Sequence, residues 1–383
     1  MPAKTVLVLG GGTGGLVAAS RLRRMLDREH RVVLVDRSPY YTFEPSFTWV
    51  MLGRRKLGRI TRELKALEKR GIEVRTAEVT AIDLANKRVA LEPTAEIAYD
   101  YLVIALGVDY SAEEVPGLNR AWTFYHADGA DGLAAELPKF TSGRIAVAVS
   151  ALPYKCPAAP YEGAMLLADY FRRRKLRDKV ELHVYTPEER PLYASGAEAG
   201  GRILTLLQER DIGFTGGSAM KSVNHQKREI NFQDGTSAPF DMLIATPIHR
   251  LPRILAETGL VGESGWIAVD RETLATAAPD VYAIGDCTGV PIAGGQMLPK
   301  AGVFAHGEAE VVARNLTAQI GGKEPIWAFG GQGACFMETG GGRGAYIAGH
   351  YFEEPPRVHF RGPSRWMHWS KAGFERLWLW RWF

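Results

Sequence analysis

An apolar run near the start of the chain leads directly into a cluster of glycines. Residues 5–9, T-V-L-V-L, are continuously apolar, as expected of a strand buried on both faces of a parallel sheet. After G-G-G-T-G-G comes an amphipathic stretch, L-V-A-A-S-R-L-R-R-M-L, and then a second apolar run, R-V-V-L-V, which ends at Asp36. The pattern predicts a strand, a tight turn, a helix and a second strand, the opening of a parallel α/β unit.

The glycines of this turn have the spacing G-x-G-x-x-G. Gly10 permits the tight turn, Gly12 lets the backbone approach a pyrophosphate, and Gly15 lets the helix pack closely on the strand. The helix N-terminus then offers free N–H groups to the anion. Asp36, 21 residues after Gly15, is placed to accept hydrogen bonds from ribose hydroxyls. A glycine-rich loop without a ligand is the alternative, but the complete strand–turn–helix–strand–acid order favours a dinucleotide site.

Two later apolar runs end in short polar turns. Residues 99–107, Y-D-Y-L-V-I-A-L-G, end at Gly107, and residues 281–287, V-Y-A-I-G-D-C, contain Asp286. With the first glycine turn, they resemble the three-part FAD signature of the glutathione reductase-like flavoproteins, although Leu106 stands where threonine is common. The resemblance implies that the chain binds FAD and that Asp286 holds its ribityl and phosphate region. A helix-capping role is the alternative for Asp286.

A second strand pattern lacks the glycines that a nucleotide turn needs. R-I-A-V-A-V, residues 144–149, reads as the first strand of a second Rossmann-like unit. The turn after it contains Pro153, Pro157 and Pro160, which lack N–H donors and cannot form a compact nest of amides around a phosphate. We therefore expect an electron donor other than NAD(P)H. The predicted fold is α/β, with two interleaved Rossmann-like dinucleotide-binding domains and a C-terminal membrane-associating region.

A cysteine stands in this proline-rich turn. Cys156 lies in K-C-P-A-A-P-Y-E, just before a helical pattern that starts near Tyr161. Because a helix N-terminus lowers a nearby thiol pKa, we expect a reactive thiolate there, and a buried structural cysteine is the alternative. Glu162 is a candidate for relaying protons, although an acidic residue in a first helical turn also complements the helix dipole.

Four motifs together resemble one family. C-P-A-A-P-Y-E resembles a motif of the sulfide:quinone oxidoreductases and of the flavocytochrome c sulfide dehydrogenase flavoprotein. The others are E-P-S-F-T-W-V-M-L-G (44–53), L-P-K-A-G-V-F-A (298–305) and G-A-C-F (333–336). The resemblance implies that Cys156 and Cys335 flank the flavin as a redox pair. It also implies that Lys300, with the helix beginning near Gly302, lies at the pyrimidine edge, where positive charge stabilises anionic reduced flavin. A solvated loop lysine is the alternative for Lys300.

The chain departs from that family at two positions. Many members have a third cysteine where the best match here is Tyr125, and a histidine four residues later corresponds to Gly129. We therefore expect no covalent flavin link or persulfide relay at Tyr125. The third cysteine of this chain, Cys287, follows Asp286 and is interpreted as small buried packing.

The C-terminus is rich in tryptophan. Five of nine tryptophans fall in the last 18 residues: Trp366, Trp369, Trp378, Trp380 and Trp382. On a helical wheel all but Trp382 share one half with Phe374 and Leu377, while His368, Lys371, Glu375 and Arg376 lie outside or at its edge. This pattern is typical of a helix in the membrane interface, and docking on the protein's own core or a partner is the alternative. Phe336, beside Cys335, is a candidate wall for a quinone ring or a core aromatic.

Length and composition restrict the function classes. The 383 residues allow two domains and an appendage, and a net charge of +4 gives no argument for nucleic acid. Three cysteines make neither a disulfide framework nor a predicted metal site. We find no secretory signal and no run of 18 apolar residues, which favours a peripheral (monotopic) protein on the cytoplasmic side of the cell membrane. The predicted parts are an FAD-binding domain (1–112 and 251–325), a degenerate second Rossmann domain (113–250) and a C-terminal region with the tail (326–383).

The resemblance implies FAD-dependent oxidation of sulfide to zero-valent sulfur or polysulfide, with electrons passed to membrane quinone. Hydrosulfide would attack a disulfide or sulfur bridge between Cys156 and Cys335, and the released thiolate would pass two electrons to the flavin. Three alternatives stay open: a sulfide dehydrogenase flavin subunit that reduces a c-type cytochrome, a type II NADH:quinone oxidoreductase-like enzyme, and a non-catalytic membrane-docked redox sensor. The expected partners are sulfide, quinone and the lipid bilayer surface, with a homo-oligomer possible.

Overall fold

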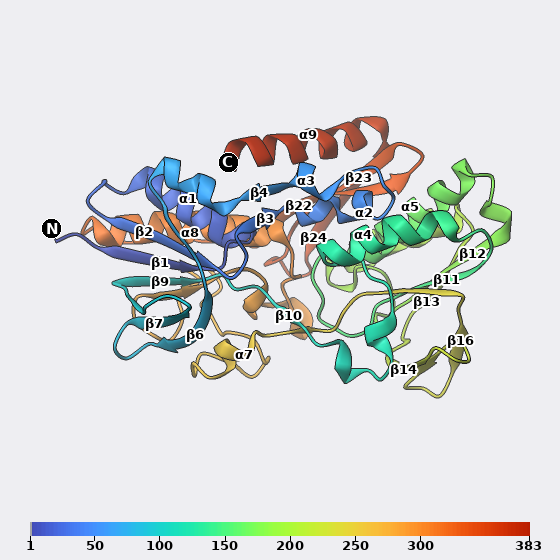
Figure 1. The fold of residues 1–383 in the computed structure, drawn as a ribbon, viewed down its shortest axis with the longest axis horizontal. Coiled ribbons are helices and arrows are strands. Elements are labelled where there is room, and N and C mark those ends of the chain that lie inside the picture. The colour runs from blue at the N-terminus through green and yellow to red at the C-terminus, as the bar shows by residue number, and fades with distance from the viewer. Residues whose placement is uncertain (1) are drawn as a thin grey trace.

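The computed structural model describes residues 2–383 and contains two parallel sheets side by side (Figure 1). The first is five-stranded, in the order β19-β9-β1-β2-β5. Its central strand β1 is the apolar run T-V-L-V-L, which is buried because neighbouring strands and both faces cover it. The strands are β1 (Thr5–Leu9), β2 (Arg31–Asp36), β5 (Glu73–Thr76), β9 (Tyr101–Ile104) and β19 (Val281–Ala283).

The two faces of this sheet are covered differently. Val6 and Val8 of β1 point to the face on which α1 (Thr13–Met25) and α8 (Gly302–Ile320) pack. Leu7 and Leu9 point to the opposite face, because successive side chains of a strand alternate. There they meet a small antiparallel sheet made of β6 (Glu78–Asp83), β7 (Arg88–Glu92) and β8 (Ile97–Ala98).

The second sheet has the strand order β13-β12-β11-β17, all parallel. Its strands are β11 (Gly143–Ala148), β12 (Val180–Tyr185), β13 (Ile212–Thr215) and β17 (Met242–Ala245). The helices α5 (Ala159–Arg173) and α6 (Gly196–Gln208) pack into the main core with Ile145 and Val147. The other face packs on the antiparallel sheet of β14 (Met220–Asn224), β15 (Glu229–Phe232) and β16 (Ser237–Pro239).

The last part of the chain is an antiparallel sheet followed by a long helix. The strands β22 (Gln332–Gly340), β23 (Arg343–His350) and β24 (Arg357–Ser364) form the sheet, and α9 (Arg365–Trp382) follows. Ser364 caps α9 by accepting the N–H of Met367. In Figure 1 the helix lies along the top of the molecule, above α1 and the strands β3 and β4.

The two faces of α9 have opposite environments. The exposed large apolar residues are Trp366, Trp369, Phe374, Leu377 and Trp380, and the buried residues are Lys371, Glu375, Trp378, Leu379 and Trp382. The grouping of Trp378 with the exposed face was therefore wrong. Trp378 is only 5% exposed because its ring packs on Phe43, Phe374 and Trp382. Among residues 2–383, no helix is both long and apolar enough to cross a bilayer.

The remaining elements are short. Three antiparallel strand pairs, β3–β4, β10–β18 and β20–β21, join the larger parts. Their bounds are β3 (Tyr40–Thr42), β4 (Thr61–Glu63), β10 (Asp109–Tyr110), β18 (His249–Arg250), β20 (Pro291–Ile292) and β21 (Gln296–Met297), and the remaining α-helices are α2 (Phe47–Val50), α3 (Leu57–Ile60), α4 (Ala127–Glu136) and α7 (Arg253–Ala256). The predicted α/β class with two parallel-sheet units is confirmed.

Candidate active site

The turn between β1 and α1 has the shape of a phosphate cradle. Gly10 has φ +100°, and a Cβ there would lie 2.2 Å from the carbonyl oxygen of Ala105. At Gly15 a Cβ would lie 1.8 Å from the carbonyl oxygen of Gly10, so only glycine fits at either position. At Gly12 no described atom lies within 4 Å of that point. The backbone at Gly12 is therefore open to a ligand, at the N-terminus of a helix whose first turn holds no acidic residue.

Asp36 is held against this turn from the end of β2. One carboxylate oxygen accepts the N–H of Gly11 at 2.5 Å, and the other accepts the N–H of Ser38 at 2.7 Å. Burial raises the pKa of Asp36, and these two hydrogen bonds oppose the shift. Gly107, three residues after β9 ends at Ile104, has φ +68° and no described atom within 4 Å of a built Cβ.

Asp286 and Lys300 lie together at the N-terminal end of α8. Both line a small pocket with Gly285, Ala301 and Glu308. Burial raises the pKa of Asp286, and within residues 2–383 its carboxylate oxygens have no recorded hydrogen bond. The carboxylate is thus available to a ligand that enters this pocket.

The Lys300 side chain is buried rather than solvated in a loop. Its Nζ donates to the carbonyl oxygens of Asp286 at 2.7 Å and Thr288 at 3.1 Å. The ammonium also lies 3.3 Å from the ring centroid of Trp266, a cation–π contact. Burial lowers the pKa of Lys300 to about 8, so its charge is sensitive to pH near neutrality.

The backbone of Cys156 is hydrogen-bonded to the turn that contains Lys300. Its N–H donates to the carbonyl oxygen of Lys300 at 2.7 Å, and its own carbonyl accepts the N–H of Ala159 at 2.8 Å, the first residue of α5. Cys156 has φ +52°, a left-handed conformation that side chains rarely adopt. The backbone between β11 and α5 is therefore held in an unusual shape that sets the position of this thiol.

Cys335 belongs to the C-terminal part of the chain. It lies on β22 opposite Ile347 of β23, and it is half-buried. The two thiols are near enough that the charge of Cys335 raises the pKa of Cys156. Both are free thiols in the structure. Two predicted site residues 179 positions apart are thus brought together.

The expected lowering of the Cys156 pKa was wrong. Burial raises its pKa to about 12, and the nearby carboxylate of Glu162 raises it further. The same two causes raise the pKa of Cys335 to about 11. Although Cys156 is exposed, the surrounding protein atoms desolvate its thiolate and raise the pKa. This rise is larger than the lowering expected from the dipole of α5, which starts only at Ala159. Both thiols therefore stay protonated at neutral pH unless a neighbouring charge changes.

Glu162 is the hub of a buried polar cluster behind the thiols. Its Oε1 accepts the hydroxyl of Thr48 at 2.5 Å and the ammonium of Lys371 at 2.6 Å, and its Oε2 accepts the backbone N–H of Glu338 at 3.0 Å. Lys371 lowers the pKa of both Cys156 and Cys335, opposing the effect of Glu162. The ion pair thus sets the electrostatic potential at both sulfur atoms.

Sequence reasoning missed three members of this cluster. Lys371 and His368 lie on α9, and Glu338 is three residues after Cys335 on β22. The carboxylate of Glu338 contacts Nδ1 of His368 at 2.8 Å. The sequence signal that could have identified Lys371 and His368 is their position on the helical wheel. Both lie off the tryptophan face, on the side that a surface helix turns toward its own protein.

Phe336 connects the cysteine strand to α9. Its ring packs against Tyr346 with centroids 5.1 Å apart and against Phe374 with centroids 6.3 Å apart. Phe374 in turn packs against Trp378 of the same helix. A continuous row of aromatic rings therefore runs from the residue beside Cys335 to the partly exposed Phe374.

Of the remaining predicted positions, Tyr125 and Cys287 are buried and Gly129 is partly exposed. Tyr125 is 4% exposed, and the charge of Cys156 contributes to raising its pKa, which places the phenol near that thiol. Gly129 lies in α4, where a Cβ would meet the carbonyl oxygen of Thr123 at 2.4 Å. Cys287 is fully buried, and its thiol donates to the carbonyl oxygen of Ile284 at 3.3 Å.

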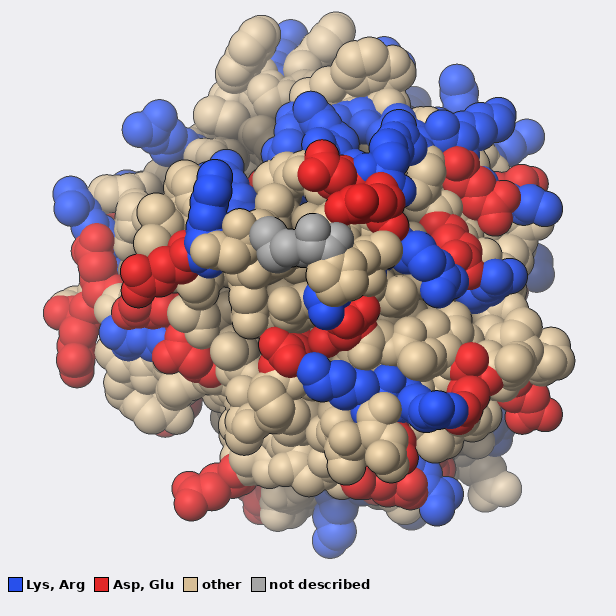
Figure 2. Space-filling model, turned by 90° about the vertical axis from the view of Figure 1, so that its left-hand side faces the viewer, with Lys and Arg blue, Asp and Glu red and all other residues tan. Residues whose placement is uncertain are grey.

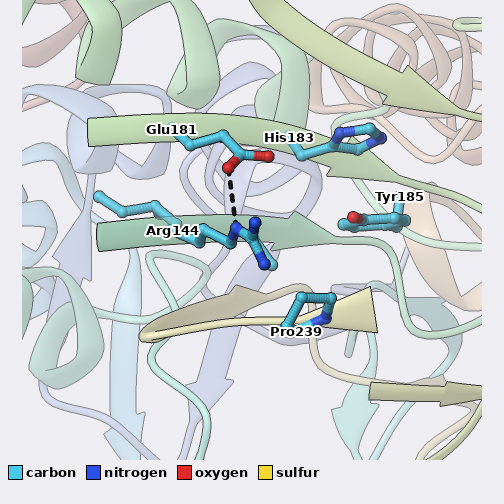
Figure 3. A pocket seen from close by; sticks show the side chains of 7 residues that line it. Arg144, Glu181, His183, Tyr185 and Pro239 are labelled. Atoms are coloured by element: carbon cyan, nitrogen blue, oxygen red, sulfur yellow. Dashed lines mark hydrogen bonds and ion pairs between the residues drawn. The ribbon is translucent and has the colours of Figure 1, made fainter. Parts of the chain in front are cut away.

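A surface pocket of about 280 Å³ lies elsewhere, along one face of the second sheet (Figure 3). Glu181, His183 and Tyr185 of β12 alternate along it, as residues on one face of a strand do. Arg144 of β11 pairs with Glu181 at 2.8 Å. Nucleotides bind at the carboxyl ends of parallel strands, so this pocket does not replace the missing glycine turn.

The comparison with protein-family models agrees with this architecture. The model described as pyridine nucleotide-disulphide oxidoreductase matches residues 4–309, which covers both parallel-sheet units. The chain belongs to the pyridine nucleotide-disulphide oxidoreductase family.

Two curated relatives and one solved structure are the most informative. The mitochondrial sulfide:quinone oxidoreductase of Mus musculus is 25% identical over 91% of this chain and 79% of its own. The sulfide-quinone reductase of Aquifex aeolicus is 26% identical over 99% of this chain and 91% of its own. The X-ray structure of the Aquifex aeolicus sulfide:quinone oxidoreductase superposes with a TM-score of 0.90 at 24% identity, over 99% of this chain and 91% of that one. The resemblance predicted from the four motifs is confirmed.

Proposed function

We propose that this chain is a sulfide:quinone oxidoreductase, which oxidises sulfide to zero-valent sulfur or polysulfide and passes the electrons to quinone. The observation that carries the proposal is that Cys156, at the turn that contains Lys300, lies within electrostatic range of Cys335 and that both thiols lie near the Glu162–Lys371 pair. A pair of thiols that gains and loses a disulfide or sulfur bridge exchanges two electrons, the number that sulfide oxidation releases. The relatives named above carry the same activity in their names.

FAD is the proposed cofactor, and the residues present fit it. The open backbone at Gly12 suits a pyrophosphate, Asp36 suits an adenosine ribose, and the free carboxylate of Asp286 suits the ribityl chain. Bound FAD would supply the two-electron carrier between the thiols and the quinone. The N-terminus of α8 and the Lys300 ammonium bring positive charge to the same pocket.

In this proposal Lys371 and Glu162 act on the charge and the protonation of the thiols. In the proposed mechanism, hydrosulfide attacks one sulfur of a bridge between Cys156 and Cys335, which leaves one cysteine persulfidated and the other as a thiolate. The Lys371 ammonium stabilises that thiolate, because it lowers the pKa of both cysteines. Glu162 accepts and returns protons beside them.

Quinone is proposed to reach the site along the aromatic row that contains Phe336 and Phe374. These rings suit a flat apolar ligand, and they lead toward the exposed face of α9. That face presents Trp366, Trp369 and Trp380, and we propose that it lies in the headgroup region of a membrane, as a peripheral anchor. The cytoplasmic face of the cell membrane is the proposed location.

We keep the domain division predicted from the sequence as part of the proposal. The first sheet draws its strands from residues 5–104 and 281–283, and the second from residues 143–245. A discontinuous FAD-binding domain and an inserted second domain account for this order.

The test is an acceptor comparison with the purified, FAD-loaded protein. Sulfide should drive reduction of a short-chain ubiquinone, and NADH should not, since the turn after β11 has no glycine cradle. Cytochrome c should be a poor acceptor. Reduction of quinone by NADH would favour the NADH:quinone oxidoreductase alternative. Efficient reduction of cytochrome c by sulfide would favour the sulfide dehydrogenase alternative. If sulfide reduces neither acceptor, the non-catalytic redox sensor is favoured.

A further inference from the structure

The turn that carries Cys156 is held by one buried carboxylate, that of Glu188. The hydroxyls of Tyr154 and Tyr161 both donate to its Oε2, each at 2.8 Å. Tyr154 stands two residues before Cys156 and Tyr161 five residues after it. The two hydrogen bonds therefore hold the turn on both sides of the thiol. We name Glu188, Tyr154 and Tyr161 the tyrosine clamp.

The clamp lies buried behind a thiol that is itself exposed. Tyr154, Tyr161 and Glu188 are 3%, 0% and 8% exposed, whereas Cys156 is open to the surface. Burial raises the pKa of both phenols well above its usual range, so both keep the protons that they donate. The clamp can thus fix the backbone from inside and leave the sulfur accessible to a substrate.

The carboxylate of Glu188 depends on these hydroxyls. Within residues 2–383, its recorded hydrogen-bond partners are uncharged: the two phenols, the hydroxyl of Thr186 and the backbone N–H of Tyr193. A buried carboxylate without an ion pair needs such donors, because leaving it unsatisfied is costly. The carboxylate and the turn therefore hold each other in place.

The backbone at Cys156 needs this support. Its φ of +52° lies in the left-handed region, which a residue with a side chain occupies only where the surrounding structure imposes it. On one side, the N–H of Cys156 donates to the carbonyl oxygen of Lys300 at 2.7 Å. On the other side, the clamped hydroxyl of Tyr154 also lies 3.2 Å from the carbonyl oxygen of Pro157, the residue after Cys156. Loss of the clamp would let the turn relax, and the thiol would move with it.

Glu188 stands where a nucleotide-binding unit places its acidic residue. In the first sheet, Asp36 ends β2, the strand beside β1, and accepts the N–H of Gly11 in the turn after β1. In the second sheet, Glu188 comes three residues after the end of β12, the strand beside β11, and accepts hydroxyls from the turn after β11 and from α5. An acid at this place of a Rossmann unit binds a ribose. Here tyrosine hydroxyls occupy the carboxylate instead.

We infer that Glu188 is a positioning residue of the cysteine site, which holds the Cys156 turn through the hydroxyls of Tyr154 and Tyr161. The inference rests on the proposed function and deepens it, because it takes Cys156 as the reacting thiol. Glu188 acts through the backbone of the turn. An acid placed as if for a ribose thus fixes a sulfur nucleophile.

The test removes the clamp as a unit. The triple variant Glu188→Leu, Tyr154→Phe, Tyr161→Phe loses the carboxylate and both hydroxyls together and keeps the aromatic rings. In the full-length, FAD-loaded protein, hydrogen exchange of the peptide that contains Cys156 should become about tenfold faster or more, as for a lost hydrogen bond to a charged group. Reduction of the flavin by sulfide should slow about 10- to 100-fold, because the thiol is misplaced. Reoxidation of dithionite-reduced flavin by a short-chain ubiquinone should keep its wild-type rate.

Two variants control for a general loss of structure. Glu188→Gln keeps an oxygen that accepts both hydroxyls, so it should stay close to wild type in both measurements. Tyr170→Phe removes another tyrosine hydroxyl of α5, which lies 3.3 Å from the guanidinium of Arg174, and should change neither. If the triple variant does not fold, Tyr154→Phe gives the same readouts with smaller changes, because Glu188 then keeps its other partners.

The outcomes separate the clamp from the function. Unchanged exchange around Cys156 in the folded triple variant would show that Glu188 does not hold the turn, and the inference would be wrong. Faster exchange with a wild-type rate of flavin reduction by sulfide would overturn it as well, because the position of the turn would then not matter. Equal slowing of both flavin half-reactions would mark a general structural effect and also contradict it. If sulfide does not reduce the wild-type flavin, the proposed function fails, whereas faster exchange in the variant still supports the clamp.

Discussion

The ionisation of Cys156 is governed by its burial and by its charged neighbours. Burial and Glu162 raise its pKa, while Lys371 lowers it. The balance keeps the thiol neutral at rest, which protects it from unspecific oxidation, because the thiolate is the reactive form. The Glu162–Lys371 pair therefore influences how readily a thiolate forms.

Replacing Glu162 and replacing Lys371 should change the reactivity of the thiols in opposite directions. Glu162→Gln removes a negative charge and should lower the pKa of both thiols, so that alkylation by iodoacetamide at neutral pH becomes about tenfold faster per pKa unit. Lys371→Met should make it slower. Mass spectrometry of the reduced protein identifies the alkylated residue, and buried Cys287 serves as an internal control. Equal rates in both variants would contradict the account.

At this scale the sequence predicted half of the site. Cys156, Glu162 and Cys335 stand in short motifs and could be named in advance. The pairing of Lys371 with Glu162 could not be predicted, because the two residues are 209 positions apart. The helical pattern shows on which face of the helix Lys371 lies, but not which residue contacts that face. The thiol pKa was predicted in the wrong direction, because a helix dipole is visible in a sequence and desolvation is not.

The helix α9 is amphipathic in an unusual way, with tryptophan on both faces. Its buried face combines apolar rings with Lys371 and Glu375, and Glu375 accepts from Ser46 at 2.5 Å and from Arg55 at 3.0 Å. Charged residues were assigned to the polar side of the wheel, but partners from distant segments allow their burial. The periodicity identified the helix, and only the fold shows which tryptophan packs inward.

Two neighbouring tryptophans of α9 should therefore respond differently to truncation. Trp378→Ala removes a 5% exposed ring from the core and should cost about 3–5 kcal/mol of unfolding free energy. Trp380→Ala, at a position 76% exposed, should change the unfolding free energy by less than about 0.5 kcal/mol. Chemical denaturation measures both. A large loss at Trp380 with none at Trp378 would mean that the helix faces the other way.

The whole molecule presents the exposed tryptophans beside basic residues. Figure 2 shows Lys and Arg gathered in the upper part of one end of the molecule, the level at which Figure 1 draws α9. Arg70 donates to the carbonyl oxygen of Arg381, and Arg21 lies over the ring of Trp382. Basic groups at this place suit anionic lipid headgroups.

Binding to vesicles should need both features. We expect the protein to sediment with vesicles that contain phosphatidylserine, more weakly with pure phosphatidylcholine, and less as salt increases, since salt screens the basic groups. The combined change of Trp366, Trp369 and Trp380 to serine should abolish sedimentation and leave the melting temperature unchanged. Unaltered binding by that variant would remove α9 as the membrane contact.

The fold as a whole was predictable where local patterns determine it. The two parallel-sheet units follow from apolar runs with glycine or proline turns, which are signals of a few residues. The antiparallel sheet from Gln332 to Ser364 was not predicted, because its strands are only partly apolar and their partners are set by long-range packing. That sheet is what brings Cys335 within electrostatic range of Cys156 and the backbone of Glu338 into contact with Glu162.

The most direct measurement of the central claim is an anaerobic titration of the FAD-loaded protein with sulfide, followed by flavin absorbance. Wild type should bleach rapidly, while Cys156→Ser and Cys335→Ser should bleach at least about 100-fold more slowly with FAD still bound. Cys287→Ser should bleach like wild type. Rapid bleaching of both Cys156→Ser and Cys335→Ser would contradict the account, because electrons would then reach the flavin without the thiol pair.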